Sequence, residues 1–146
     1  MRRVAITGIG IVSSIGSNAQ ETTASLREGR SGVVFAPDYA EHGFRCQVHG
    51  APQVDIEAHV EKRVRRFMGD GAAWNHIAMT QAIADAGLAD SEVSHERTGL
   101  IMGSGGPSTK ALFSAHQTVL KSGGTKRVGP FAVPKAMSST NSATLA

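Results

Sequence analysis

Residues 55–67 repeat apolar side chains at the spacing of an α-helix. With each residue turning 100°, the apolar positions fall within an arc of about 80° and the basic positions fall on the opposite side. The pattern predicts one continuous amphipathic helix with a basic outer face. Its apolar positions are Ile56, Val60, Val64 and Phe67, and its basic positions are Lys62, Arg63, Arg65 and Arg66.

A second helix is predicted over residues 70–86. Apolar residues follow the i, i+3, i+4, i+7 spacing from Met79 to Ala86, Asp70 is a plausible N-cap, and Gly87 is a typical stop. One face of this helix carries only alanine over its second half. Small side chains permit close packing, so we expect this face to lie against a sheet or another helix. The alanines are Ala78, Ala82 and Ala86.

A run rich in Val and Ile predicts a buried strand over residues 3–12, and a short, mostly apolar run predicts another over 98–102. Strands that alternate with helices indicate an α/β sheet. Shorter extended pieces are expected at 32–35 and 45–49. The remaining elements are helices over 19–28 (capped by Ser17 or Asn18) and 108–121, a loop over 122–135, and a helix that begins at Ser138 or Ser139.

The N-terminal sequence bears on targeting, and the C-terminal sequence bears on whether the chain is truncated. Arg2 and Arg3 before an apolar run imitate a secretory signal, but Gly8, Gly10 and the polar residues after Val12 interrupt that run. No stretch approaches the roughly 18 apolar residues of a membrane span, so a cytoplasmic protein is expected. The last helix stops after about two turns, which predicts a truncated chain rather than a natural terminus.

Charge is unevenly distributed along the 146 residues. The chain has 15 basic and 12 acidic residues, yet residues 98–146 contain no acidic residue at all. Such a segment suggests a face that meets an anionic partner, although a merely solubilising surface explains the charge alone equally well. Its basic residues are Lys110, Lys121, Lys126, Arg127 and Lys135.

The motifs that would indicate common chemistry are incomplete. The turn at 8–13 has Ser13 where a dinucleotide fingerprint needs its third glycine, and the turn at 103–110 lacks phosphate-loop spacing. That second turn is better explained by small residues that leave room for a neighbour. Six histidines show no metal-binding spacing, and Cys46 is expected to be a small buried hydrophobe rather than a nucleophile.

Several ordered blocks resemble the β-ketoacyl-acyl-carrier-protein synthases, and the bacterial type I condensing enzymes of fatty acid synthesis most of all. The resemblance spans the whole chain. Its blocks are VAITGIGIVSSIG (4–16), SLREGRSGV (25–33), RFM (66–68), QAIADAGL (81–88), GSGG (103–106), VGPF (128–131) and KAM (135–137).

The resemblance implies a thiolase-like α/β fold of layered helices and mixed sheet, of which residues 1–146 would be about the N-terminal third, ending before the nucleophilic cysteine. It implies an acyltransferase that joins acyl and malonyl thioesters with loss of CO₂. It also implies a homodimer and an acyl carrier protein as partner, without a cofactor, nucleic acid or membrane. The family's catalytic Cys, two His and Lys match no position here, so this chain alone is expected to be inactive.

The resemblance also assigns two groups of binding residues. Gly105, Gly106 and Pro107 are implied near the floor of the acyl pocket, although Pro107 has no assignable family role. Because acyl carrier proteins are acidic, basic side chains at the pocket entrance are expected to dock them. The remaining acyl-pocket residues are Ala132, Val133 and Met137, which reach the neighbouring subunit's pocket, and the docking residues are Lys62, Arg63, Arg66, Lys126 and Arg127.

Two alternatives stay open. A non-catalytic module that only binds a carrier protein or a synthase partner would also lack the nucleophile. A relative that acts on polyketide intermediates would share the same blocks.

Overall fold

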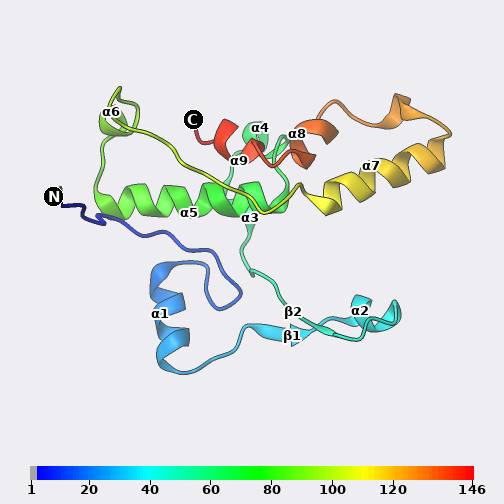
Figure 1. Cartoon of the computed structure of the whole chain (residues 1–146), viewed down its shortest axis with the longest axis horizontal. Helices are drawn as coiled ribbons and strands as arrows, with labels where there is room; N and C mark the ends of the chain where they lie inside the picture. Colours follow the sequence, from blue (N-terminus) through cyan, green and yellow to red (C-terminus); the bar gives the residue numbers. More distant parts are fainter. Residues whose placement is uncertain (1–2) are drawn as a thin grey trace.

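The computed structural model describes residues 3–146 as a mainly helical body with a smaller lobe beneath it (Figure 1). The lobe contains α1 (Ala19–Arg27), β1 (Val33–Phe35), α2 (Pro37–Glu41) and β2 (Val48–Gly50). The body contains α3 (Ile56–His59), α4 (Lys62–Arg65), α5 (Asp70–Ala86), α6 (Asp90–Val93), α7 (Thr109–Ser122), the 3-10 helix η1 (Thr125–Arg127), α8 (Ala132–Ala136) and α9 (Thr140–Ala143).

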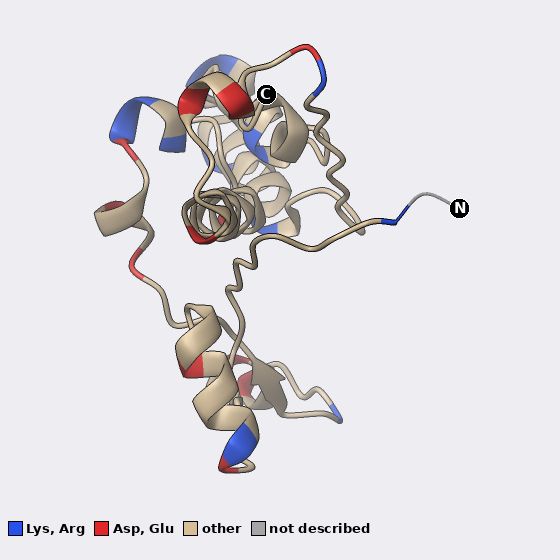
Figure 2. Cartoon of the chain, turned by 90° about the vertical axis from the view of Figure 1, so that its left-hand side faces the viewer, with Lys and Arg blue, Asp and Glu red and all other residues tan. Residues whose placement is uncertain are grey.

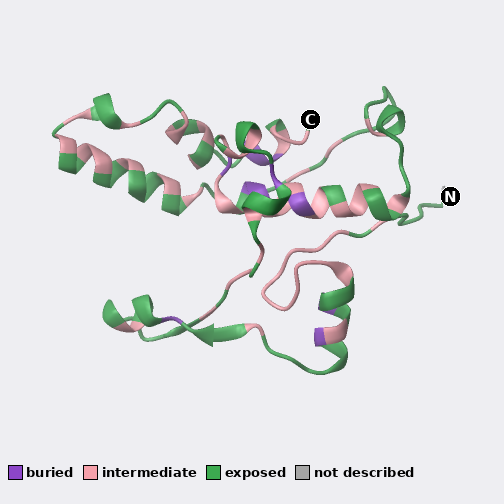
Figure 3. Ribbon diagram, turned by 180° about the vertical axis from the view of Figure 1, so that it is seen from behind, coloured by how far each residue is buried: buried purple, intermediate pink, exposed green. Residues whose placement is uncertain are grey.

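The core is built around the first half of α5. The buried cluster combines three residues of α5 with Val60 and Met68, and partly buried side chains from α3, α4 and the N-terminal segment pack against it. Figure 3 shows this buried material concentrated in α5 and the neighbouring helix ends. The α5 members are Ala72, Ala73 and Ile77.

Helix ends follow the capping residues that the sequence predicts, with one shift. The Asn18 side chain accepts a hydrogen bond from the Glu21 N–H (2.8 Å) at the start of α1. Gly87 ends α5 at φ +67°, a left-handed conformation that suits glycine. Asp70 is the first residue of α5 and Gly69 is its N-cap, so the predicted cap is wrong by one residue.

The prediction of one continuous helix over 55–67 is wrong. The segment forms the separate helices α3 and α4, because Val60 adopts an extended backbone (φ −124°, ψ 122°) between them. This break turns Val60 into the core, where only 2% of its surface is exposed. Burial of that side chain outweighs the hydrogen bonds of one uninterrupted short helix.

The predicted strands at 3–12 and 98–102 are also wrong as hydrogen-bonded strands. Among the described residues, the one sheet is the antiparallel pair β1–β2, with Val34 opposite His49. Residues 3–12 instead run beside α5 (Figure 1), where Asp85 and Gln81 accept the N–H groups of Ile9 (2.9 Å) and Ile11 (3.0 Å). Side chains therefore satisfy backbone groups that a neighbouring strand would otherwise bind.

The alanine face of α5 packs closely, as the sequence predicts, and its neighbour is this N-terminal segment. A Cβ atom added at Gly8 would overlap the Ala82 carbonyl, and one added at Gly10 would overlap the Ala78 carbonyl. The two glycines thus serve contact between backbones rather than phosphate binding.

The C-terminal part is more helical than predicted. The expected loop at 122–135 contains η1 and most of α8, so that prediction is wrong in part. The helix expected from Ser138 or Ser139 forms as α9, with Ser139 at its N-cap. Asn75 of α5 donates a hydrogen bond to Asn141 (2.7 Å), which ties α9 to the core.

Candidate functional site

The junction between α4 and α5 packs against α8 and the start of α7. A Cβ at Gly69 would lie 2.9 Å from the Ser108 side chain and 3.0 Å from the Lys135 carbonyl oxygen, so only glycine permits this approach. The Ser108 N–H donates to the Ala136 carbonyl (3.1 Å), which joins the start of α7 to the end of α8. Segments separated by about half the chain are thereby held together.

Two adjoining hollows lie along this junction. One, of about 550 Å³, opens between α3, α4 and the start of α5, and its basic side chains are Lys62, Arg65, Arg66 and Lys135. The other, of about 360 Å³, opens between α5, α7 and η1, and its basic side chains are Lys110, Arg127 and Lys135. Lys135 and Asp70 line both hollows, so the two form one basic region, in which basic side chains outnumber the acidic ones, Asp55, Glu57 and Asp70.

Some of these charges have partners in the chain. Arg63 pairs with Glu61 (2.8 Å), Arg65 pairs with Glu57, and Lys110 pairs with Asp70 (2.7 Å). The pairs of Arg63 and Lys110 are exposed and therefore contribute little to stability, whereas the Arg65 side chain is partly buried. Figure 2 shows the Lys and Arg residues of α4 together on the outside of the body.

Arg66 differs from the other α4 cations because it contacts aromatic rings. Its guanidinium carbon lies 4.9 Å from the centre of the Phe67 ring and 5.1 Å from the centre of the Phe131 ring. The two rings meet edge to face, with their centres 5.0 Å apart. This geometry combines two cation–π contacts with an aromatic pair.

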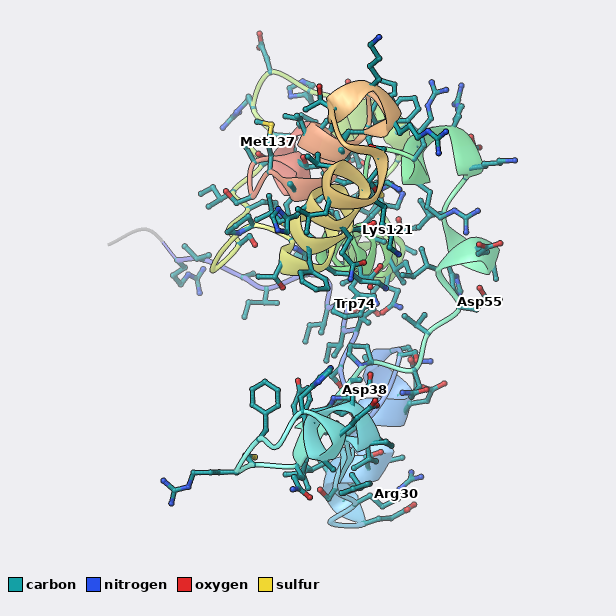
Figure 4. All side chains as sticks on the ribbon, turned by 90° about the vertical axis from the view of Figure 1, so that its right-hand side faces the viewer. Arg30, Asp38, Asp55, Trp74, Lys121 and Met137 are labelled. Atoms are coloured by element: carbon teal, nitrogen blue, oxygen red, sulfur yellow. The ribbon has the colours of Figure 1, made fainter. Side chains whose placement is uncertain are left out.

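An apolar hollow of about 610 Å³ lies on the other side of the α7–α8 pair. Four of the six predicted acyl-pocket residues line it: Pro107, Ala132, Val133 and Met137. Val133 and Met137 are largely exposed, and Figure 4 shows Met137 on the upper body, far from the lobe that carries Arg30 and Asp38. The apolar hollow shares part of its wall with the smaller basic hollow, through Ala111, Ala115, Val128 and Ala132.

The other predicted site residues lie outside these hollows. Gly105 and Gly106 precede Pro107 and do not line the apolar hollow; a Cβ at either would meet nothing within 4 Å among the described residues. Arg63 and Lys126 are exposed beside the basic region without lining it.

Sequence reasoning missed Lys135, which borders both basic hollows, and the ring pair of Phe67 and Phe131. Lys135 was visible as one of five cations in an acid-free segment, but only the fold brings it beside α4. Phe67, predicted on the apolar face of the helix, is not part of the buried core cluster and instead packs against Phe131.

The described residues supply no evident nucleophile. Cys46 is exposed, so the expectation that it is buried is wrong; it lies between α2 and β2, where the small lobe leaves it uncovered. Within residues 3–146, no group of three or more His, Cys, Asp or Glu side chains could hold a metal ion. No helix of this part of the chain has the length and apolar character needed to cross a bilayer.

Comparison with known proteins gives one consistent family. The model of the β-ketoacyl synthase N-terminal domain matches residues 1–146. The chain is 44% identical to 3-oxoacyl-[acyl-carrier-protein] synthase 1 of Haemophilus influenzae and 46% identical to that of Escherichia coli K12, over its whole length in both cases. It spans 36% of the length of these curated relatives.

Solved structures agree with the sequence matches. A β-ketoacyl synthase from Burkholderia phymatum superposes with a TM-score of 0.82 at 30% identity, over 99% of this chain and 36% of that one. The ishigamide ketosynthase/chain length factor superposes with a TM-score of 0.83 at 25% identity, with the same coverage. The thiolase-like α/β fold implied by the sequence blocks is confirmed. The chain belongs to the β-ketoacyl synthase family, whose N-terminal domain model it matches over residues 1–146.

Proposed function

We propose that this chain is the N-terminal part of a β-ketoacyl-acyl-carrier-protein synthase that acts in fatty acid elongation. Such an enzyme forms an acyl–cysteine thioester, and decarboxylation of a malonyl thioester then generates the carbanion that attacks it and releases the cysteine thiolate. In this proposal the nucleophile and its partners belong to later parts of a full-length synthase. This chain supplies binding surfaces.

The observation that carries the proposal is identity of 44–46% to two 3-oxoacyl-[acyl-carrier-protein] synthases, sustained over the whole chain. The polyketide alternative has weaker support, because the ketosynthase/chain length factor is only 25% identical. A cytoplasmic homodimer is part of the proposal, with Val133 and Met137 exposed toward the second subunit.

The arrangement of the hollows supports one role for the apolar hollow and another for the basic region. The apolar hollow suits a hydrocarbon chain, because small and flexible side chains leave an adaptable wall. In the proposal Ala132, Val133 and Met137 form its wall together with Pro107, and Gly105 and Gly106, which do not line this hollow, lie just before Pro107 near the floor of the acyl pocket. The adjoining basic region suits an acidic carrier protein, with Lys62, Arg63, Arg66, Lys126 and Arg127 as docking residues. A thioester would then pass from the docking surface to the acyl wall across the α7–α8 pair.

The decisive experiment measures condensation. A full-length synthase that carries this chain as its N-terminal part should convert acyl-carrier and malonyl-carrier thioesters to a β-ketoacyl product with release of CO₂. The 146-residue chain alone should give no product above a control without enzyme. A full-length protein that binds the carrier but forms no product would favour the non-catalytic binding module instead.

A further inference from the structure

The strongest unassigned feature is the contact of Arg66 with two aromatic rings. Within the described residues, Arg66 has no carboxylate partner within salt-bridge distance, whereas Arg63 and Arg65 each have one. Its guanidinium instead lies about equally far from the centres of the Phe67 and Phe131 rings, at 4.9 and 5.1 Å. We define Arg66, Phe67 and Phe131 as the clasp.

The clasp joins two segments that the chain itself leaves far apart. Phe67 precedes the N-cap of α5, and Phe131 is the N-cap residue of α8. The Phe131 carbonyl also accepts the Lys135 N–H (3.1 Å), so the residue that meets Arg66 also begins the hydrogen bonding of α8. A fixed position of the Phe131 ring therefore fixes the start of this helix.

Helix α8 depends on such outside contacts. It has five residues, none of them buried, and helices this short are not stable by themselves. Its far end is held by the bond from Ser108 N–H to the Ala136 carbonyl, and its near end meets the clasp. Between these two anchors lie Ala132, Val133 and Ala136, which line the apolar hollow.

We infer that Arg66 is a positioning residue that fixes α8, and with it the wall of the apolar hollow, through the Phe67–Phe131 ring pair. The positioning of α8 by Arg66 does not depend on the proposed function. Only the statement that the wall of the apolar hollow contacts an acyl chain rests on that proposal. Arg66, although one of the proposed docking residues, thereby differs from Lys62 and Arg63, for which the described residues provide no ring contact.

The first test measures amide hydrogen exchange in residues 128–137 of the 146-residue protein. Arg66→Met keeps most of the side-chain length but removes the charge, and about two- to five-fold faster exchange is expected there from the loss of exposed cation–π contacts. Arg66→Lys should restore part of the protection. Lys62→Met, at the start of α4, the helix that Arg66 caps, is the matched control and should leave exchange in 128–137 unchanged.

A second variant tests whether Arg66 acts on α8 through the aromatic ring of Phe131. Phe131→Leu should accelerate exchange in the same segment. Adding Arg66→Met to it should have almost no further effect there, because the contact of Arg66 with Phe131 is already lost and its remaining contact, with Phe67, lies outside residues 128–137. Equal exchange in the Arg66→Met and Lys62→Met proteins would overturn the inference. So would an acceleration that extends equally into α5, because that indicates general destabilisation.

Activity then distinguishes this inference from the proposed function. In a full-length synthase, Arg66→Met should raise KM for a carrier-free long-chain acyl thioester, and Arg66→Lys should be intermediate. Lys121→Met, at an exposed position outside the proposed binding residues, should have no effect. If the exchange contrast holds and that KM is unchanged, Arg66 still positions α8, and the assignment of the apolar hollow to the acyl chain is what fails.

Discussion

Helices α5 and α7 are the two longest helices of the described residues, yet the chain buries residues of α5 alone. Three residues of α5 are buried, and the N-terminal segment, α3 and α9 lie against it. Helix α7 has no buried residue, and its large apolar side chains Leu112, Phe113 and Leu120 are 48–68% exposed. Helix α7 is the more amphipathic of the two, yet its contacts with η1 and α8 leave much of its apolar face open, whereas α5 becomes the core helix.

The difference in burial between α5 and α7 predicts that α5 determines the stability of this chain and that the open side of α7 is free for binding. Changes around α5 should reduce the free energy of unfolding of this chain, because they act on packed atoms. Changes around α7 should leave unfolding nearly unaffected and act on whatever occupies the open side. Matched substitutions near α5 and near α7 test this difference.

Gly10→Val should have the largest effect. The new side chain would overlap the Ala78 carbonyl, which cannot move without distorting α5. Overpacking of this kind costs about 1–3 kcal/mol or more, and here it meets backbone. We expect loss of the cooperative transition in chemical denaturation followed by circular dichroism.

The control for that variant is Gly106→Ala beside α7, where a Cβ meets nothing within 4 Å. It should unfold like the unmodified protein. A Gly10→Val protein with the same unfolding midpoint would contradict the close approach of residues 8–10 to α5.

Ile77→Ala should lower the free energy of unfolding by about 2–4 kcal/mol, since it leaves a cavity in the core. Ile77 is only 3% exposed. Leu112→Ala is the counterpart on α7 and should cost well under about 1 kcal/mol, because its side chain is half exposed already. Similar losses in urea titrations of both variants would show that α7 is as well packed as α5.

Gly106→Ile tests the proposed acyl pocket on the open side. In a full-length synthase the added side chain should shorten the longest accepted acyl chain, with kcat/KM for that chain falling about ten-fold, or roughly 1.4 kcal/mol. Short acyl thioesters should react as before. Unchanged discrimination between short and long chains would place the acyl chain elsewhere.

Charge reversal of Lys62 and Arg63 together should have the smallest effect. Exposed ion pairs contribute about 0.2–1 kcal/mol each, so KM for carrier-bound substrate should rise a few-fold and the effect should diminish with added salt. Arg66 is left intact because its ring contacts would confuse the result. A carrier-free thioester is the control, and an equal rise in its KM would indicate a structural role for the two cations.

The aromatic contacts of the lobe and of the body also differ, in how far apart their residues lie along the chain. Tyr39 lies against Phe44 and His49, with ring centres 5.3 and 5.5 Å apart. This cluster uses residues close along the chain, on α2 and the hairpin. The clasp joins Phe67 to Phe131, which no local pattern indicates.

Sequence alone determined the three longest helices, α1, α5 and α7, and the family of this protein. Asn18, Gly87 and Ser108 mark helix ends through their own side chains or backbone freedom, and the alanine face of α5 predicts a close neighbour. Such signals are local, so they can be read without knowledge of the fold. The family blocks were equally readable because they retain order and spacing.

Only the tertiary structure decided the pairing of distant segments. Val60 interrupts a helical pattern because the core accepts its side chain, and residues 3–12 form no strand because α5 supplies the hydrogen-bond acceptors Asp85 and Gln81. Arg66 belongs with Phe131 rather than with the other cations of α4, since a cation–π contact depends on positions in space. Hydrophobic periodicity specifies that a face is apolar, but which atoms cover that face depends on the rest of the folded chain.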